Sequence, residues 1–148
     1  MTNKYWNTFY NKNDLINYPS NFAKYVYNKY LINKKINLLD IGCGNGRDSF
    51  FFAKKKISVT AIDSSSNIIK KNTFLSKRNN NLNFKLLNIQ NKKINKLGKF
   101  DTIYSRFFLH TINNKIEKNF FDLIILLSKK NKTLVMLEFR TIKDEMLT

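Results

Sequence analysis

A glycine-rich turn and two aspartates are the residues of this chain whose types and spacing could do chemistry. Residues 38–46 read Leu-Leu-Asp-Ile-Gly-Cys-Gly-Asn-Gly, and Asp63 follows seventeen positions after the last of these glycines. An apolar strand, a glycine turn, a helix and a second strand that ends in a carboxylate form the layout of a nucleoside-binding βαβ unit. A dinucleotide fingerprint starting at Gly42 needs glycine at position 47, where Arg47 stands. The spacing therefore indicates a nucleoside other than a dinucleotide.

The alternating pattern Asp40-x-Gly42-x-Gly44-x-Gly46 resembles motif I of the class I S-adenosylmethionine-dependent methyltransferases. The resemblance is strongest over residues 36–63, and it implies a Rossmann-like α/β fold with S-adenosylmethionine as the cofactor. It also implies that the turn, with Cys43, holds the methionine part of the cofactor and that Asp40 favours its ammonium group. Because a small side chain is needed between two glycines, we interpret Cys43 as a packing residue and not as a nucleophile.

Asp63 stands where the resembling family carries an acidic residue that bridges both ribose hydroxyls, and Ser64 is next to it. A carboxylate accepts hydrogen bonds through two oxygens and therefore suits a vicinal diol. Capping of the following helix is an alternative role for Asp63 that can coexist with the first. By the same resemblance, Asn88 accepts the adenine amino group, Ile89 packs on the adenine ring, and Ser105 lines the cofactor.

Three residues near the ends of later strands are candidates for the transfer step, namely His110, Arg106 and Arg140. A histidine, with an ordinary pKa near ~6.5, can act as general base for an alcohol or amine acceptor. An anionic acceptor needs cationic clamps instead, and arginines at the carboxyl edge of a parallel sheet are placed for that. For His110 we favour a packed, hydrogen-bonded role within its aromatic stretch. No metal site is predicted.

Apolar runs that alternate with helical periodicity predict a parallel sheet with helices on both faces. The expected strands are 36–41, 57–62, 82–87, 100–105 and 133–139. The expected helices are 20–32, 46–56, a segment after Ser64–Ser66 that contains Ile68 and Leu75, and a segment that Asn114 and Glu117 begin as a capping box. Residues 91–99 are expected to form a polar loop, and Asp101 a structural contact.

We expect residues 1–35 to form an N-terminal helical cap and residues 36–148 to form a single cofactor-binding domain. Class I methyltransferases usually continue beyond a fifth strand, and here few residues remain after 139. The sheet is therefore expected to be truncated after the fifth strand, and we interpret the chain as a fragment that lacks part of the usual acceptor pocket.

The composition is strongly basic, with 27 Lys and Arg against 10 Asp and Glu and a formal net charge of +17. Nearly all of this charge is lysine, whereas arginine is the usual reader of bases and phosphates. We therefore favour drift in an AT-rich genome over selected RNA binding. The single cysteine excludes an internal disulfide and fits a reducing cytoplasm, and no segment resembles a targeting or membrane-spanning element, so we expect neither.

The sequence thus predicts a cytoplasmic S-adenosylmethionine-dependent methyltransferase that acts on a small, anionic or sugar-linked metabolite. Arg47-Asp48 resembles methyltransferases of the tellurite-resistance type. Tyr5-Trp6, Phe9-Tyr10, Pro19-Ser20-x-Phe22-Ala23 and Glu138-Phe139-Arg140 more weakly resemble those of bacterial surface-saccharide clusters. Two alternatives stay open. One is an RNA or nucleotide methyltransferase, and the other is a non-catalytic cofactor-binding partner of a second subunit.

Overall fold

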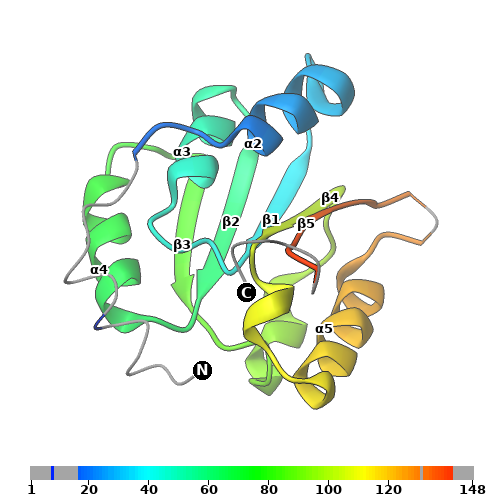
Figure 1. Ribbon diagram of the computed structural model, residues 1–148. Helices are drawn as coiled ribbons and strands as arrows, with labels where there is room; N and C mark the ends of the chain where they lie inside the picture. The colour runs from blue at the N-terminus through cyan, green and yellow to red at the C-terminus, as the bar shows by residue number, and fades with distance from the viewer. Residues whose placement is uncertain (1–7, 9–16, 131, 142–148) are drawn as a thin grey trace.

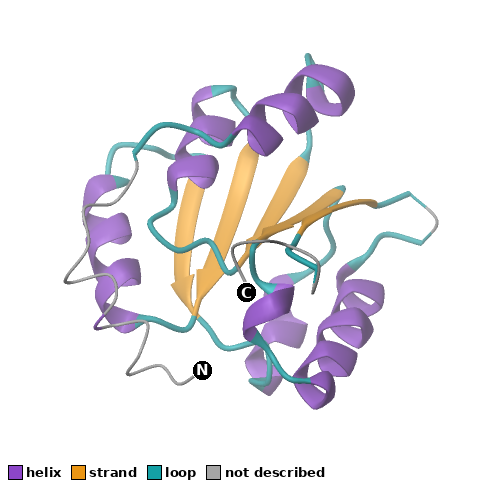
Figure 2. Cartoon of the chain, viewed as in Figure 1, coloured by secondary structure: helices purple, strands orange, loops and turns teal. Residues whose placement is uncertain are grey.

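The computed structural model describes Thr8, residues 17–130 and residues 132–141, and within these residues the fold is a parallel sheet between two layers of helices (Figures 1 and 2). The strands are β1 (Asn37–Ile41), β2 (Ser58–Asp63), β3 (Leu82–Leu86), β4 (Thr102–Arg106) and β5 (Leu134–Glu138). All their pairings are parallel, and the spatial order is β3-β2-β1-β4-β5. β1, the first strand in the sequence, therefore lies at the centre of the sheet. β2 and β3 extend the sheet on one side of β1, and β4 and β5 extend it on the other. The predicted α/β fold is confirmed.

The helices of the described residues are α2 (Asn21–Val26), α3 (Arg47–Lys54), α4 (Ser66–Leu75) and α5 (Asn114–Leu127). A π-helical turn, η1 (Tyr27–Leu31), continues α2, and two short 3-10 helices are η2 (Lys92–Leu97) and η3 (Leu109–Thr111). Helices α2, α3 and α4 lie on one side of the sheet, and α5 lies on the other (Figure 1).

Two hydrophobic clusters, one on each face of the sheet, hold these layers together. Successive strand residues point to opposite faces, so Leu38 joins the cluster under α2, α3 and α4, whereas Leu39 joins the cluster under α5. The largest fully buried side chains include Phe52 in the first cluster and Phe120 in the second. Helices therefore cover both faces, as the sequence predicted.

The element boundaries differ from the predicted ones in a few places. The helix expected over 20–32 is regular only to Val26 and continues as η1, and part of the loop expected over 91–99 is η2. The predicted capping box of Asn114 and Glu117 is wrong by one residue. The N-cap of α5 is Asn113, whose side chain accepts from the backbone N–H of Ile116. Asparagine is a good cap at either position, so only the tertiary placement of the helix selects between the two.

The expected division into a cap over 1–35 and a domain over 36–148 can be followed only in part. The aromatic pairs Tyr5-Trp6 and Phe9-Tyr10 lie outside the described residues. Of the expected cap, α2 and η1 contribute Ala23, Val26 and Leu31 to the first hydrophobic cluster. This described part of the cap is therefore packed into the same core as the sheet.

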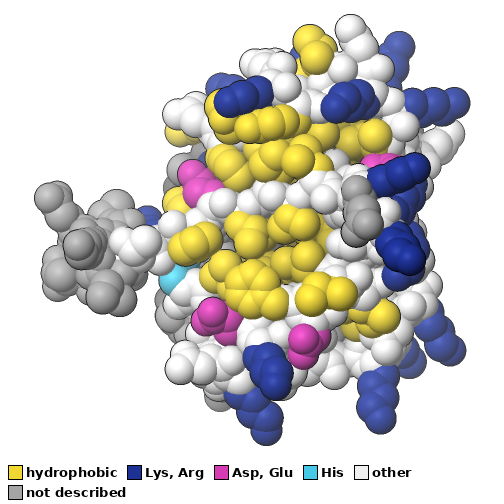
Figure 3. Space-filling view, turned by 90° about the vertical axis from the view of Figure 1, so that its right-hand side faces the viewer, with side chains coloured by type: hydrophobic (Ala, Val, Ile, Leu, Met, Phe, Trp, Pro, Cys, Tyr) yellow, Lys and Arg dark blue, Asp and Glu magenta, His cyan; other side chains and the backbone are white. Residues whose placement is uncertain are grey.

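One side of the molecule exposes hydrophobic side chains around β5. Within the described part of the chain, β5 pairs with β4 and with no second strand. Val135 and Phe139 are 39% and 50% exposed, and Phe121 and Ile125 of α5 are 42% and 73% exposed. Figure 3 shows this side, with hydrophobic side chains gathered at its centre and Lys and Arg side chains at its margins. No helix among the described residues has the length and apolarity needed to cross a bilayer.

Candidate cofactor-binding site

The glycine loop between β1 and α3 is fastened to the end of β2. The backbone N–H groups of Gly42 and Cys43 both donate to the carbonyl oxygen of Ile62, at 2.9 and 3.1 Å. Gly42, Gly44 and Gly46 have φ values of 72°, 51° and 75°. These left-handed conformations are costly for residues with a Cβ atom, so the predicted need for glycine in this turn is confirmed.

The glycines also allow close contact with two aromatic rings of the protein. A Cβ atom on Gly42 would lie 2.6 Å from Cδ2 of Phe108, and one on Gly46 would lie 2.7 Å from Cζ of Phe84. In the structure, Phe84 and Phe108 make the close approach to these glycines.

Asp63 connects the end of β2 to the glycine loop and to the start of α4. Its Oδ2 accepts from the N–H of Gly44 at 2.9 Å, and its Oδ1 accepts from the N–H of Ser65 at 2.8 Å. Burial raises the pKa of this carboxyl, and backbone N–H donors at Ser65, Gly44 and Ser64 partly oppose the rise. The alternative role of Asp63 as the cap of the following helix is wrong, because the N-cap of α4 is Ser65 and Asp63 bonds only the N–H of that cap residue. Each oxygen of an ionised carboxylate has a further lone pair with which it can accept a hydroxyl.

Asp40 lies in the centre of the sheet near the end of β1 and is only 2% exposed. The hydroxyl of Ser49 donates to its Oδ2 at 2.5 Å. The pKa of Asp40 is raised to about 7, mainly by burial, with the Ser49 hydrogen bond lowering it and the negative charges of Asp48 and Asp63 adding to the rise. The carboxyl therefore titrates near neutral pH, and a nearby cation would shift it toward the ionised form.

The remaining predicted cofactor residues lie near the carboxyl ends of the strands. Ile41, at the end of β1, pairs with Ile62 of β2 on one side and with Ser105 of β4 on the other. Ser105 is buried, and its hydroxyl donates to the carbonyl oxygen of Ile41 at 2.8 Å. Asn88 is exposed, and its Oδ1 accepts from the N–H of Gln90. Ile89 packs into the second hydrophobic cluster.

Cys43 packs against the first hydrophobic cluster, and its thiol is free. Burial, together with the nearby carboxylates of Asp40 and Asp63, raises the pKa of the thiol well above its usual value. The thiol is therefore protonated at neutral pH, whereas a nucleophilic cysteine is a thiolate. The predicted packing role of Cys43 is confirmed.

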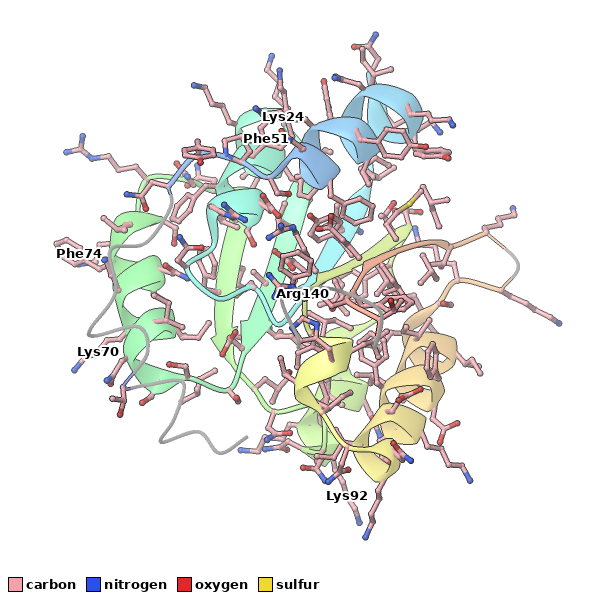
Figure 4. All side chains as sticks on the ribbon, in the orientation of Figure 1. Lys24, Phe51, Lys70, Phe74, Lys92 and Arg140 are labelled. Atoms are coloured by element: carbon pink, nitrogen blue, oxygen red, sulfur yellow. The ribbon has the colours of Figure 1, made fainter. Side chains whose placement is uncertain are left out.

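The three predicted transfer residues gather around the ring of Phe107, which follows β4 with a φ of 55°. The guanidinium carbons of Arg106 and Arg140 lie 3.9 and 5.2 Å from the centre of this ring. Figure 4 labels Arg140 on the segment that follows β5. Arg106 is also ion-paired with Glu138, its register partner in β5. The charge of Arg106 is thus largely balanced within the protein.

His110 differs from the expectation of a packed residue. The side chain is exposed, and its ring meets Phe107 edge-on with 5.7 Å between the ring centres. It lies in η3, where the chain turns back toward α5. The imidazole is therefore reachable from solvent, so the packed part of the prediction is wrong.

Other features of this region have a structural role or lie away from Asp40 and Asp63. Asp101 forms the expected structural contact, since its Oδ2 accepts from the N–H of Asn37 at 3.0 Å. A cleft of about 290 Å³ borders the loop at Asn45 and Arg47, but neither Asp40 nor Asp63 lines it. Across the residues that the structure describes, no group of three His, Cys, Asp or Glu side chains is placed to hold a metal ion.

The sheet order, the left-handed glycine loop and the aspartate at the end of β2 define a class I S-adenosylmethionine-dependent methyltransferase fold. The sequence family described as "Methyltransferase domain" matches residues 32–147, so the chain belongs to that family. No curated protein sequence matches the chain.

Solved structures with this fold include the following three. The PH0226 protein of Pyrococcus horikoshii OT3 superposes with a TM-score of 0.72 at 19% identity, over 84% of this chain and 54% of its own. Coclaurine N-methyltransferase, solved with N-methylheliamine and SAH, gives 0.68 at 22% identity over 79% and 34%. TehB of Haemophilus influenzae gives 0.61 at 21% identity over 86% and 42%. The chain thus spans between a third and slightly over half of these relatives' lengths.

Proposed function

We propose that this chain binds S-adenosylmethionine and takes part in transfer of its methyl group. The observation that carries the proposal is the pair of carboxyls beside the glycine loop, the buried Asp40 and the half-buried Asp63, in a protein of net charge +17. Asp40 and Asp63 are desolvated, and burial raises the pKa of both. A ligand that combines cationic groups with a vicinal diol would supply these two carboxylates with positive charge and with hydroxyl donors. This is the chemistry of S-adenosylmethionine, which carries a sulfonium, an ammonium and a ribose.

The residues present fit this cofactor in the roles that the family resemblance implies. Asp63 would accept from the ribose hydroxyls while its N–H contacts fix its orientation. Asp40 would face the ammonium, and Asn88 the adenine amino group. Gly42, Cys43, Gly44 and Gly46 would border the methionine part, with Ser64, Ile89 and Ser105 completing the site. Two of these assignments involve less open side chains, since Ser105 already bonds Ile41 and Ile89 is packed in the interior.

When bound, the cofactor supplies an electrophilic methyl group that is displaced in line and leaves a neutral thioether. The protein then has to align the acceptor with that methyl and exclude water, because positioning provides most of the rate in such a reaction. The residues around Phe107 are placed at the carboxyl edge where the acceptor would arrive. Within this group Arg106 is paired with Glu138, and Arg140 brings a second positive charge.

For the acceptor we propose a small, anionic or sugar-linked metabolite. Arg140, beside the same aromatic ring as the ion-paired Arg106, suits an acceptor oxygen that arrives already deprotonated, and such an acceptor needs no general base. If the acceptor is an alcohol, the exposed His110 is placed to take its proton. The proposed location is the cytoplasm, which fits the free thiol of Cys43.

Nucleic acid as the acceptor is less well supported. Lys24, Lys70 and Lys92 project from three different sides of the molecule (Figure 4), so lysine charge is spread around the surface. RNA methylation would predict steep weakening of binding as salt rises, with a slope set by the number of phosphate contacts. The proposed small acceptor predicts a shallow dependence on salt.

The proposal is tested by titrating the chain calorimetrically with S-adenosylmethionine and its product S-adenosylhomocysteine. The wild-type chain is expected to bind both and not a nicotinamide dinucleotide. Asp63→Ala should weaken binding about 10- to 100-fold, because a charge-assisted hydrogen bond contributes about 1.5–3 kcal/mol. The matched control is Asp122→Ala, an exposed carboxylate on α5. Failure of the wild type to bind either molecule, or equal binding by Asp63→Ala, would refute the assignment.

Turnover separates an enzyme from a non-catalytic partner. Methyl transfer is followed with radiolabelled cofactor and a panel of small anionic and sugar-linked acceptors. We expect transfer to at least one member of the panel. Tight cofactor binding without transfer to any acceptor, in this chain and in a longer chain, would favour a binding partner over an enzyme.

A further inference from the structure

A buried polar cluster joins the segment before α2 to the first turn of α3. Its members are Asp48 of α3, Ser20 and Tyr104 of β4, which are 6%, 5% and 1% exposed. The Oδ1 atom of Asp48 accepts from the backbone N–H of Ser20 at 2.7 Å. Its Oδ2 atom accepts from the hydroxyls of Ser20 and Tyr104, both at 2.8 Å. Hydrogen bonds to an ionised acceptor are among the strongest in proteins.

The two partners of Asp48 are themselves held firmly. The hydroxyl of Ser20 also accepts from the N–H of Ala23 at 3.0 Å, so one hydroxyl both caps α2 and attaches it to α3. The ring of Tyr104 lies between Phe22 of α2, at 5.4 Å between ring centres, and Phe52 of α3, at 5.1 Å. Contacts with α2 and α3 therefore fix the donors that Asp48 accepts from.

The cluster acts on the same turn that follows the glycine loop. Asp48 is two residues after Gly46, and the N–H of Phe50 donates to the carbonyl oxygen of Gly46 at 2.8 Å. The neighbouring Ser49 donates to Asp40. The first turn of α3 is thus held from β1 through Ser49 and from α2 and β4 through Asp48. A shift of this turn would move the end of the glycine loop with it.

We propose that Asp48 is a positioning residue for the cofactor, which holds Ser20 and Tyr104 and so fixes the glycine loop in the geometry that binds S-adenosylmethionine. The inference rests on the proposed function. Asp48 acts through the loop and not on the ligand, because it is only 6% exposed and both of its oxygens accept from donors of the protein. Coupling of this kind is reciprocal. If the attachment raises affinity for the cofactor by some factor, the bound cofactor must strengthen the attachment by the same factor.

The test removes the donors and leaves the carboxylates unchanged. Ser20→Ala deletes one hydroxyl, Tyr104→Phe deletes the other, and Ser20→Thr keeps a hydroxyl as the conservative rescue. The matched control is Thr133→Val at the opposite edge of the sheet. The hydroxyl of Thr133 also accepts a backbone N–H, from Lys129 at 2.8 Å, and donates to the carbonyl oxygen of Phe100 at 2.6 Å.

Affinity for S-adenosylhomocysteine is measured by calorimetry at a temperature where circular dichroism shows every variant to be folded. Ser20→Ala and Tyr104→Phe are each expected to weaken binding about fivefold or more, the size of one lost hydrogen bond. Ser20→Thr and Thr133→Val should stay within about twofold of wild type. In the wild type, hydrogen exchange at the Ser20 and Ala23 amides should slow when the product is bound.

The outcomes are distinguishable. If the wild type binds the product and both donor variants bind it equally well, the positioning role of Asp48 is refuted and the proposed function stands. If Thr133→Val weakens binding as much as Ser20→Ala, the effect is a general loss of stability and the role is again refuted. If the wild type does not bind at all, the proposed function itself fails.

Discussion

Asp40→Asn offers a quantitative test of the buried carboxyl at the centre of the site. The pKa of Asp40 is raised from 3.8 to about 7, mainly by burial. A raised carboxyl pKa means that the folded state binds more protons than the unfolded state between these two values. The free energy of unfolding therefore falls as pH rises from about 4 to about 8, and a shift of about three pKa units corresponds to a loss of about 4 kcal/mol. The asparagine variant cannot titrate and lacks this loss.

The assay is urea unfolding of wild type and Asp40→Asn at several pH values, followed by circular dichroism. Groups that do not interact with Asp40 titrate alike in both proteins, so the difference between the two free energies reports Asp40 together with its electrostatic coupling to its neighbours. We expect the stability of wild type relative to the variant to fall by about 4 kcal/mol between about pH 4 and about pH 8. A difference that stays constant to within about 1 kcal/mol across this range would refute the burial argument.

Cofactor binding should also depend on the protonation of Asp40. Folding favours the protonated carboxyl, whereas binding should favour the ionised one. A cationic ligand favours ionised Asp40, so the affinity for S-adenosylhomocysteine should fall below about pH 7, by up to about tenfold per pH unit. In Asp40→Asn this dependence should disappear, although the overall affinity is lower. Equal wild-type affinities at about pH 5.5 and about pH 7.5 would show that Asp40 does not face the ligand.

Three further predictions concern single residues. In urea melts, Gly46→Ala should lower the free energy of unfolding by about 1–3 kcal/mol more than Gly98→Ala. Both glycines have positive φ, but only at Gly46 would the added Cβ atom meet an aromatic ring. Equal losses would contradict this prediction. Asp101→Asn should lose stability that wild type shows near neutral pH. The contacts of Asp101 with Asn37 and Lys129 hold the pKa of Asp101 below its usual value, so this contribution is present above the usual carboxyl pKa and lost as pH falls through the lowered one. An acid unfolding curve of Asp101→Asn that matches wild type would contradict this prediction. Arg140→Ala should lower kcat/KM for an anionic acceptor about 10- to 100-fold in a kinetic assay and leave the calorimetric affinity for S-adenosylhomocysteine unchanged. Weakened binding of S-adenosylhomocysteine with unchanged kcat/KM would instead place Arg140 at the cofactor.

The sequence was sufficient for features that depend on neighbours in the chain. The glycine turn was predictable because positive φ is a local property, and Asp63 was predictable because it ends an apolar strand next to a helix start. The cap of α5 was misplaced because Asn113 and Asn114 are chemically equivalent at the sequence level. The π-helical turn after Val26 was also missed, since the apolar spacing of 20–32 fits a regular helix equally well.

Contacts between distant segments were not predictable in the same way. Asp48 reaches Ser20 across 28 residues and Tyr104 across 56, and nothing in their spacing pairs them. The ion pair of Arg106 with Glu138 follows from the register of β4 and β5, which needs the strand order as well as the strands. The exposure of His110 depends on how the chain turns after β4, so the aromatic composition around it was a poor guide.

The side of the molecule around β5 has a consequence for handling the protein. Among the described residues β5 pairs on one side, and such a strand can recruit a strand from another chain, above all when its own residues, such as Val135, are exposed. Mutual repulsion between molecules of charge +17 opposes such contacts, and dissolved ions screen that repulsion within about 8 Å at physiological ionic strength. Concentrated stocks should therefore stay clear in dilute buffer and turn turbid as sodium chloride is added.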